Sequence, residues 1–412
     1  MASYRDKRNV FVLAICQALF NSGRGLTFLV AALAAINLLG EASALLTVPI
    51  TMMLVGTASG TIPAAQLMRW LGRKTGFVIS SLIGAIGGGI CMYALSENSF
   101  TIFNIGIFLF GLYSGAAQQY RFAVADAAPD EFKAKAISLV IAAGVFGAFI
   151  GPEAAVRAKD LIGSTEFVGS FGALIGFTLA SGFIVLGIDI PKLTTEEYAD
   201  SGRPLHKILF LPVAVVAIVS ATFGYAVMNF LMTATPISMQ LGNEYIIHDV
   251  KVVIQWHVVG MFAPGFFTGS LINRIGVLKT VSLGAFLQFA AVMVALAGTT
   301  LPHFWLSLFL LGIGWNFAFT GGTTLLTEVH TASERAKVQG TNDFIVFTGM
   351  AISSLFSGTL YHFMGWNWVN MATLPMIGVV IVAVFWLALW KKTAMNSPSR
   401  NETVCRSKDM NG

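Results

Sequence analysis

Long apolar runs separated by short polar stretches extend along the chain from about residue 9 to residue 390. A helix needs roughly 20 mostly apolar residues to cross the hydrocarbon core of a bilayer. Runs of that length recur and are unbroken, unlike the short alternating strands of a membrane β-barrel. The pattern predicts twelve membrane-spanning helices, at residues 9–36, 43–67, 77–95, 100–124, 135–156, 167–187, 208–236, 250–272, 278–298, 302–326, 338–362 and 367–390.

A polar stretch between the sixth and seventh runs divides the chain into two sets of six helices. We expect an N-terminal bundle at 1–188, a cytoplasmic linker at 189–207, a C-terminal bundle at 208–392 and a polar tail at 393–412. A cleaved signal peptide is the alternative for the basic start and the apolar run behind it. The apolar character continues to about Leu39, which is too long for that alternative.

Composition supports a membrane protein. Of 412 residues, 56% are hydrophobic and 11% are charged, and the mean hydropathy is +0.75. Soluble domains carry about a quarter charged residues, so the outer surface of this chain must face lipid. The net charge is +5, and the basic residues lie in short loops rather than along one stripe, which argues against nucleic-acid binding. The three cysteines are scattered and predict no disulfide framework, metal site or cofactor.

The lysines and arginines are distributed unequally between the two sides. If the N-terminus is inside, the inner loops and termini hold 20 of the 25 basic residues. The outer side holds Arg157, Lys159 and Lys251, and Arg24 and Arg121 lie within spans. This positive-inside bias predicts a multi-pass protein of a bacterial inner membrane, with both termini in the cytoplasm.

Several features of the first half recur in the second. Gly56 and Gly72 return 204 residues later as Gly260 and Gly276. At an offset of 202 residues, ADAAPDEFKAKA (125–136) matches TEVHTASERAKV (327–338), with charges of the same sign at the same spacing. Parallel repeats about an axis along the membrane normal build a central site in secondary transporters. We therefore expect an all-α membrane protein with two pseudo-symmetric six-helix bundles around a central cavity.

These repeated loops carry a family resemblance. The stretch MRWLGRKTG (68–76) resembles the signature of the major facilitator superfamily between spans two and three, although Arg69 stands at its acidic position. The second half repeats the pattern with Asn273 at that position, and Gly147, Gly151 and Pro152 partly match the family's antiporter motif. The resemblance implies a secondary transporter that works by alternating access. The matching signature residues are Leu67, Gly72, Arg73, Lys74, Gly269, Leu271, Arg274 and Gly276.

Charged residues near the inner ends of the spans are candidates for a gate. Because helix N-termini attract negative charge, the family's acid caps span eleven. With Arg69 in its place, we expect an Arg69–Asp343 pair, the alternative being an arginine that reaches the membrane surface. Two further ion pairs, which we call ties, are expected at the inner membrane surface: Arg73 with Asp126 and Arg274 with Glu328.

The resemblance implies that spans one, four, seven and ten line the central cavity. Each of these spans carries polar residues on one helical face, which supports that assignment. The alternative is hydrogen bonding between packed helices. The candidate residues are Gln17, Asn21 and Arg24; Ser114, Gln118 and Arg121; Tyr225, Asn229 and Thr233; and Asn316, Thr320, Thr323 and Thr327.

Arg24 is the strongest single candidate for solute binding. It stands about 22 Å along span one at 1.5 Å per residue, too deep to reach the inner surface. Charges at such depth are costly and mark substrate or ion pathways. A structural ion pair with an acid on another span is the alternative. Arg121 is a weaker candidate because it lies nearer the cytoplasmic end.

The expected solute is small, polar and organic. Two arginines suit carboxylates or paired carbonyls, and Trp315 and Tyr225 could stack a flat ring. A vitamin-like heteroaromatic such as riboflavin would satisfy both sets of groups, whereas an organic anion would satisfy the arginines alone. We expect uptake by a monomer; a proton-coupled drug or metabolite exporter is the alternative. Proton coupling would use His257 or Glu153.

An enzyme is not expected. No nucleophile, metal-ligand set or pair of acids clusters at one depth in the sequence. The stretches GTASG (56–60) and GGTT (321–324) lack the lysine of a phosphate-binding loop. They indicate close packing between membrane helices instead. Pro264, in the stretch HVVGMFAPGFF, predicts a bend in span eight.

Overall fold

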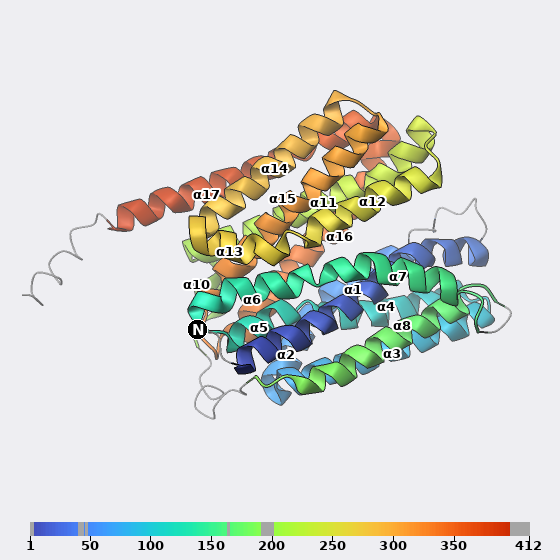
Figure 1. Cartoon of the computed structure of the whole chain (residues 1–412), viewed down its shortest axis with the longest axis horizontal. Helices are drawn as coiled ribbons and strands as arrows, with labels where there is room; N and C mark the ends of the chain where they lie inside the picture. The colour runs from blue at the N-terminus through green and yellow to red at the C-terminus, as the bar shows by residue number, and fades with distance from the viewer. Residues whose placement is uncertain (1–3, 40–44, 46–47, 163–164, 191–201, 396–412) are drawn as a thin grey trace, which may run out of the picture.

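The computed structural model describes residues 4–39, 45, 48–162, 165–190 and 202–395 (Figure 1). In these residues the chain is helical and contains no strand. The N-terminal half comprises α1 (Tyr4–Leu39), α2 (Val48–Leu71), α3 (Arg73–Ser96), α4 (Phe100–Ala117), α5 (Tyr120–Ala127), α6 (Asp130–Ala142), α7 (Gly144–Ala158), α8 (Val168–Ile184) and the 3₁₀ turn η1 (Val185–Gly187). The C-terminal half comprises α10 (Leu205–Leu209), α11 (Pro212–Ile237), the π-helical turn η2 (Ser238–Gly242), α12 (Ile247–Phe262), α13 (Gly265–Ile275), α14 (Val277–Ala297), α15 (Leu301–Thr327), α16 (Arg335–Met371) and α17 (Leu374–Met395).

The twelve predicted spans are confirmed. Twelve stretches of the described residues are long and apolar enough to cross a membrane, and each coincides with a predicted span to within several residues. The linker expected at 189–207 and the tail expected at 393–412 lie largely outside the described residues, as does Cys405.

Some spans consist of two helices, with local causes in the sequence. The fourth span breaks between α4 and α5 at Gln118 and Gln119, and the eighth breaks before α13 at Pro264. Proline has no backbone N–H and its ring clashes with the preceding turn, so the predicted bend in the eighth span is confirmed. In α16 the chain turns from the eleventh span to the twelfth at Gly365, whose φ of 78° suits glycine.

The repeat seen in the sequence corresponds to equivalent packing in the two halves. A Cβ atom added to Gly260 on α12 would lie 2.7 Å from the carbonyl oxygen of Phe309 on α15. A Cβ atom added to Gly56 on α2 would overlap the carbonyl oxygen of Phe108 on α4. Small residues let membrane helices approach until their backbones touch. The second and fourth spans therefore pack as the eighth and tenth do.

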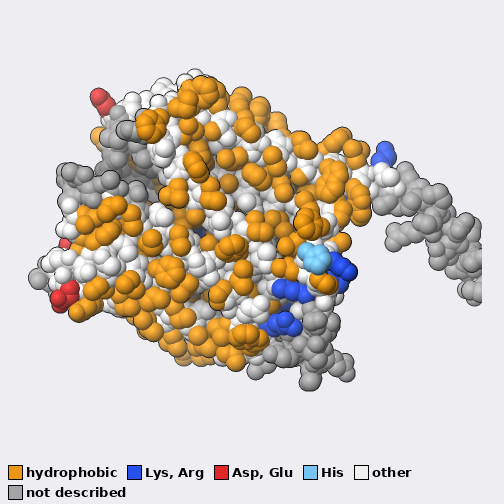
Figure 2. Space-filling view, turned by 180° about the vertical axis from the view of Figure 1, so that it is seen from behind, with side chains coloured by type: hydrophobic (Ala, Val, Ile, Leu, Met, Phe, Trp, Pro, Cys, Tyr) orange, Lys and Arg blue, Asp and Glu red, His pale blue; other side chains and the backbone are white. Residues whose placement is uncertain are grey.

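The surface is an apolar girdle with charge at its ends. Figure 2 shows hydrophobic side chains over most of one face, lysine and arginine at one end and acidic side chains at the other. We call the end that carries lysine and arginine the basic end. The first described residue and the end of α17 both lie there (Figure 1), which is what an even number of spans requires. An apolar girdle of this kind suits contact with lipid.

The two halves meet closely at the basic end. There α6 packs on α13, where a Cβ atom at Gly269 would lie 2.5 Å from the Cα of Lys135. Ser138 on α6 accepts a hydrogen bond from the Gly269 amide at 2.9 Å and donates one to the Gly265 carbonyl. On the other side, Gly340 of α16 lies against Ala65 of α2. These contacts hold the halves together around the buried charges described below.

Candidate functional site

Arg24 lies between the two halves. Its guanidinium donates a hydrogen bond to the hydroxyl of Tyr225 on α11 at 3.1 Å, and the sulfur of Met350 on α16 is 4.0 Å away. It also lies 5.5 Å from the ring centroid of Phe28. No ion pair recorded between described residues includes Arg24. The alternative of a structural ion pair for Arg24 is therefore not supported.

Tyr225 connects Arg24 to a cluster of aromatic rings. Its ring meets those of Trp315, Phe319 and Phe347 edge-on, with centroids 5.1, 5.3 and 5.7 Å away. Trp315 and Phe319, one turn apart on α15, stack with their planes 15° apart. We call Tyr225, Trp315, Phe319 and Phe347 the aromatic cluster. It joins the seventh, tenth and eleventh spans, and Arg24 of the first span contacts it through Tyr225. Its flat faces suit a planar ring.

Polar groups of α15 beside this cluster lack partners. The indole Nε1 of Trp315 and the hydroxyls of Thr320 and Thr323 are buried and have no hydrogen-bond partner in the described structure. Buried polar groups are normally satisfied, and each exception calls for an explanation. A polar solute bound beside α15 would satisfy them.

The polar residues of the first span lie at the same interface. The side chains of Gln17 and Asn21 are buried, and Asn21 donates to the Gln17 carbonyl at 3.1 Å. The backbone beside Asn21 packs on Gly147 and Gly151 of α7, where added Cβ atoms would overlap α1. The partial antiporter motif therefore acts as a close contact between the first and fifth spans.

Two asparagines predicted to bind solute form hydrogen bonds between helices. Asn229 donates to the Met350 carbonyl and the Ser353 hydroxyl of α16, both at 3.1 Å. Asn316 donates to the Met261 carbonyl at 2.6 Å and accepts from Thr268 at 2.7 Å. These hydrogen bonds match the alternative of polar contacts between packed helices, and solute binding by either asparagine stays a prediction.

Arg121, also predicted to bind solute, contacts protein groups in the structure. It forms a fully buried ion pair with Asp343 of α16 and donates to the side chain of Gln118 at 3.1 Å. Its guanidinium lies 4.5 Å from the ring centroids of Phe122 and Phe319. Because α5 and α16 belong to different halves, this pair ties the halves together. The partner of Asp343 is Arg121, and not Arg69 as expected.

A second group of buried charges lies nearer the basic end. Arg73 pairs with Asp126 at 2.8 Å, which confirms one predicted tie. Arg335, from the other half, approaches the same carboxylate at 3.4 Å. Arg73 also donates to Gln119 at 3.1 Å and to Gln339 of α16 at 2.5 Å. These five residues form what we call the inner lock.

Gln119 connects the inner lock to the Arg121–Asp343 pair. Its amide oxygen accepts from Arg73, and its amide nitrogen donates to Asp343 at 3.1 Å. Asn342 donates to the other oxygen of Asp343 at 2.9 Å. The sequence analysis missed Gln119, Gln339 and Asn342. These residues follow no recognisable spacing in the sequence. Their amides contact the buried charged side chains only once the chain is folded.

The other predicted tie is wrong. Arg274 and Glu328 are both exposed, and no recorded ion pair between described residues joins them. In this half the buried acid of the loop is Glu334, which pairs with Arg203 at 2.7 Å. The hydrogen bonds from Arg203 hold the pKa of Glu334 well below its usual range. The repeat at an offset of 202 residues aligned the charges of the two halves. It did not indicate that Arg335 of the C-terminal half pairs with Asp126 of the N-terminal half.

The two residues predicted as candidates for proton coupling, His257 and Glu153, each make local contacts within one half. The Nδ1 atom of His257 lies 2.7 Å from the Leu308 carbonyl, and the ring is buried between α12 and α15 of one half. Glu153 pairs with Arg157 one helical turn away at 2.5 Å, and both side chains are exposed. His257 is thus a packed histidine, and Glu153 belongs to a local helix pair.

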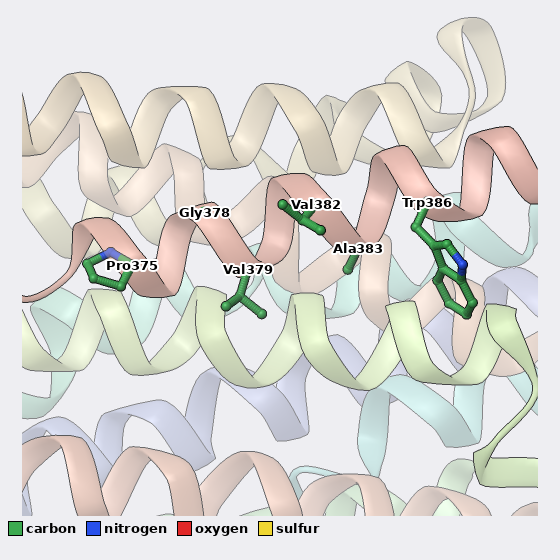
Figure 3. Close-up of a pocket in the computed structure, with 6 residues that line it drawn as sticks. All are labelled: Pro375, Gly378, Val379, Val382, Ala383 and Trp386. Carbon is green, nitrogen blue, oxygen red and sulfur yellow. The ribbon is translucent and has the colours of Figure 1, made fainter.

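Two surface grooves differ from this interior in character. The larger, about 490 Å³, runs along α17 (Figure 3) and is lined by Pro375, Gly378, Val379, Val382, Ala383 and Trp386. Its apolar, exposed lining faces where lipid would lie and suits no polar solute. The smaller, about 360 Å³, lies at the basic end beside Arg203 and Trp390. The interior between the halves remains the candidate site. No group of His, Cys, Asp and Glu in the described residues could hold a metal ion.

Comparisons with known proteins identify similar chains. The family model described as Major Facilitator Superfamily matches residues 248–404. The riboflavin transporter RfnT of Brucella anthropi is 39% identical over 378 residues, which cover 91% of this chain and 94% of RfnT. The uncharacterized MFS-type transporter YdeG of Bacillus subtilis is 30% identical, with 86% of each chain covered.

Solved structures share the fold at low sequence identity. The proton:xylose symporter XylE, bound to 6-bromo-6-deoxy-D-glucose, matches with a TM-score of 0.75 and 14% identity, covering 95% of this chain and 96% of XylE. FucP in its outward conformation matches with a TM-score of 0.73 and 15% identity, covering 92% of this chain and 98% of FucP. At these identities the likeness concerns the fold alone.

Proposed function

Because the chain belongs to the major facilitator superfamily and is a transmembrane transporter, we propose that it carries riboflavin across the membrane, in the direction of uptake. A relative of nearly full length, 39% identical, is named a riboflavin transporter. The observation that carries the proposal is the contact of Arg24 with Tyr225 at the edge of the aromatic cluster. A cation that forms no ion pair with a described residue, beside stacked rings, matches a flat, carbonyl-bearing solute.

The chemistry of riboflavin fits the groups present. Its isoalloxazine is planar and can pack against Tyr225 and Trp315. Its ring carbonyls accept hydrogen bonds from a planar guanidinium such as that of Arg24. Its ribityl hydroxyls can both donate and accept, as the unpartnered hydroxyl of Thr320 and the amide of Gln17 require. An organic anion would use Arg24 alone and leave the groups of α15 without partners.

Binding and transport can be measured with the solute's own fluorescence. We expect purified protein to quench riboflavin fluorescence saturably and to support riboflavin counterflow in proteoliposomes. Arg24→Ala should raise the Kd about 10- to 100-fold, since a hydrogen bond to a charged group contributes about 1.5–3 kcal/mol. Arg157→Ala, which changes an exposed helix pair, is the matched control. Folded wild-type protein that shows neither saturable binding nor counterflow of riboflavin would refute the proposal.

Competition separates the candidate solutes. Lumichrome, which has the ring system but no ribityl chain, should compete more weakly than riboflavin if the polar groups of α15 are used. A small dicarboxylate should not compete. Competition by the dicarboxylate that Arg24→Ala abolishes would instead favour an organic-anion carrier.

We further propose how the chain sits in the cell. The basic end faces the cytoplasm of a bacterial inner membrane, since the excess of lysine and arginine lies there. The bundles then span 1–188 and 208–392, joined by a cytoplasmic linker, and the transporter acts as a monomer. In this orientation the close contact at the basic end corresponds to a state closed toward the cytoplasm. Cysteine labelling of Lys74→Cys from each side of the membrane tests the orientation.

A further inference from the structure

Asp343 lies deep between the two halves. It stands eight residues after the start of α16, about 12 Å along the helix, and its side chain is fully buried. Its partner Arg121 comes from the opposite half and is equally buried. Charges within a membrane are costly unless they are paired, and removing one partner leaves the other uncompensated. The charge state of Asp343 therefore decides whether the halves attract each other at this depth.

The surroundings of Asp343 contain one directly paired cation. Its oxygens accept hydrogen bonds from Arg121 of α5, from Asn342 of α16 and from Gln119 at the break before α5. Arg73 of α3 also attracts Asp343 electrostatically, and Gln119 is hydrogen-bonded to both residues. The hydroxyl of Tyr225 on α11 acts electrostatically on Arg121. From α2, the neighbouring turn of α16 at Gly340 meets the side chain of Ala65 and the backbone of Thr61 and Ile62, none of which is charged.

Asp126, the other buried acid at this interface, is held differently. It faces two arginines, Arg73 and Arg335, and lies nearer the basic end. Protonation of Asp126 would leave two buried cations close together. Protonation of Asp343 would leave only Arg121, whose charge is already in contact with the faces of Phe122 and Phe319. Aromatic faces attract cations, so the unpaired state is less costly at Asp343.

A short series of contacts connects Asp343 with the solute site. Arg121 lies over Phe319, the Phe319 ring contacts Tyr225 at 5.3 Å, and the Tyr225 hydroxyl accepts a hydrogen bond from Arg24. A solute that displaces Tyr225 from Arg24 must move the ring that packs on Phe319. A proton that releases Arg121 removes the cation that lies over the Phe319 ring. Both events therefore act on the contacts of Phe319.

We propose that Asp343 is the proton-binding residue of a proton-coupled transport cycle, and that Arg121 carries its protonation to the solute site through Phe319 and Tyr225. This rests on the proposed function. A proton from water adds to the Asp343 carboxylate, the salt bridge to Arg121 is lost, and the two halves are free to separate at the basic end. When water reaches Asp343 from that end the proton leaves, and the carboxylate pairs again with Arg121. A ligand shifts such an equilibrium only if it binds the two states with different affinities. Here that ligand is the proton, which binds the open and closed states with different affinities.

The test uses full-length protein in proteoliposomes with two measurements. Riboflavin counterflow without a pH gradient reports solute exchange, and accumulation under an imposed pH gradient, with pyranine recording proton flux, reports coupling. We expect Asp343→Asn to lower gradient-driven accumulation at least tenfold more than it lowers counterflow. Glu153→Gln, an exposed acid in a local pair, should leave both measurements as in the wild type.

Several outcomes separate the two proposals. Wild-type counterflow with no response to the gradient overturns the proton proposal and leaves riboflavin transport intact. Equal accumulation by Asp343→Asn and wild type overturns it as well. Absence of counterflow in folded wild type refutes riboflavin transport, and the proton proposal falls with it. If Asp343→Asn does not fold, Asp343→Glu replaces it: retained proton flux with a shifted pH of half-maximal accumulation supports the proposal, and an unshifted profile overturns it.

Discussion

Neutralising Asp126 should open the basic end of the transporter. In Asp126→Asn, Arg73 and Arg335 lose their shared carboxylate and face each other while buried. An uncompensated buried charge costs about 3–5 kcal/mol. Separation of the halves relieves this cost, because Arg335 departs with α16 and water reaches both guanidinium groups. The hydrogen bonds from Arg73 to Gln119 and Gln339 oppose separation, so we take the lower value, about 3 kcal/mol. That is a shift on the order of a hundredfold toward the open state.

The distance between spin labels at the basic end measures this shift. Lys74→Cys and Lys279→Cys place labels at exposed sites in the first turns of α3 and α14, which are pseudo-equivalent helices of the two halves. Cys16 and Cys91 are buried and should not react, and Cys405 is replaced by serine. We expect a longer distance to dominate in Asp126→Asn. Asp130→Asn is the matched control, because that carboxylate is exposed and paired with Lys133. A distance distribution in Asp126→Asn identical to that of the control, in folded protein, would refute the reasoning.

Three further predictions concern packing, pH and histidine. Gly56→Ala and Gly260→Ala should each destabilise the protein by about 1–3 kcal/mol in chemical unfolding, because the added Cβ meets backbone. Glu334→Gln should lower the apparent Tm at neutral pH. The difference in Tm between this variant and wild type should shrink as pH falls below 4.5, the ordinary pKa of a glutamate. The lowered pKa of Glu334 stabilises the folded state above pH 4.5, and this stabilisation is lost as pH falls toward that lowered pKa. His257→Asn should leave the pH profile of uptake unchanged, because His257 hydrogen-bonds within one half.

The spans and the duplication could be predicted because each depends on a repeated local property. An apolar run of sufficient length must be a helix in lipid, since every backbone group needs an internal partner there. Gly56 and Gly260 recur because close approach of helices requires a residue without a side chain at both places. The tie between Arg73 and Asp126 was also predictable. It joins the start of α3 to the end of α5, two helix ends that one half carries at the same membrane surface.

Partners across the interface were less predictable. Helical spacing places Asn21, Asn229 and Arg121 on inward faces, but it does not say whether a neighbouring helix has already occupied their polar groups. Asn229 is satisfied by α16 and Arg121 by Asp343. Asp343 was predicted to pair with Arg69 in a gate, and its partner is Arg121 instead, because only the assembled halves show which arginine reaches it. Gln119 gave no signal, since an amide beside a helix break resembles any other loop residue.

The duplicated scaffold carries an unequal set of charges, and this inequality bears on how the transporter works. The backbone contacts of the second and fourth spans recur in the eighth and tenth. The charges do not, because Arg335 crosses to Asp126 while Arg274 and Glu328 remain exposed. If both halves kept their acids and arginines to themselves, the charges would stabilise each bundle equally in every conformation. Because Arg335, Gln339 and Asp343 instead reach into the other half, their energy depends on how far apart the bundles stand. We therefore propose that the asymmetry makes the two similar bundles a gate whose closure is electrostatic.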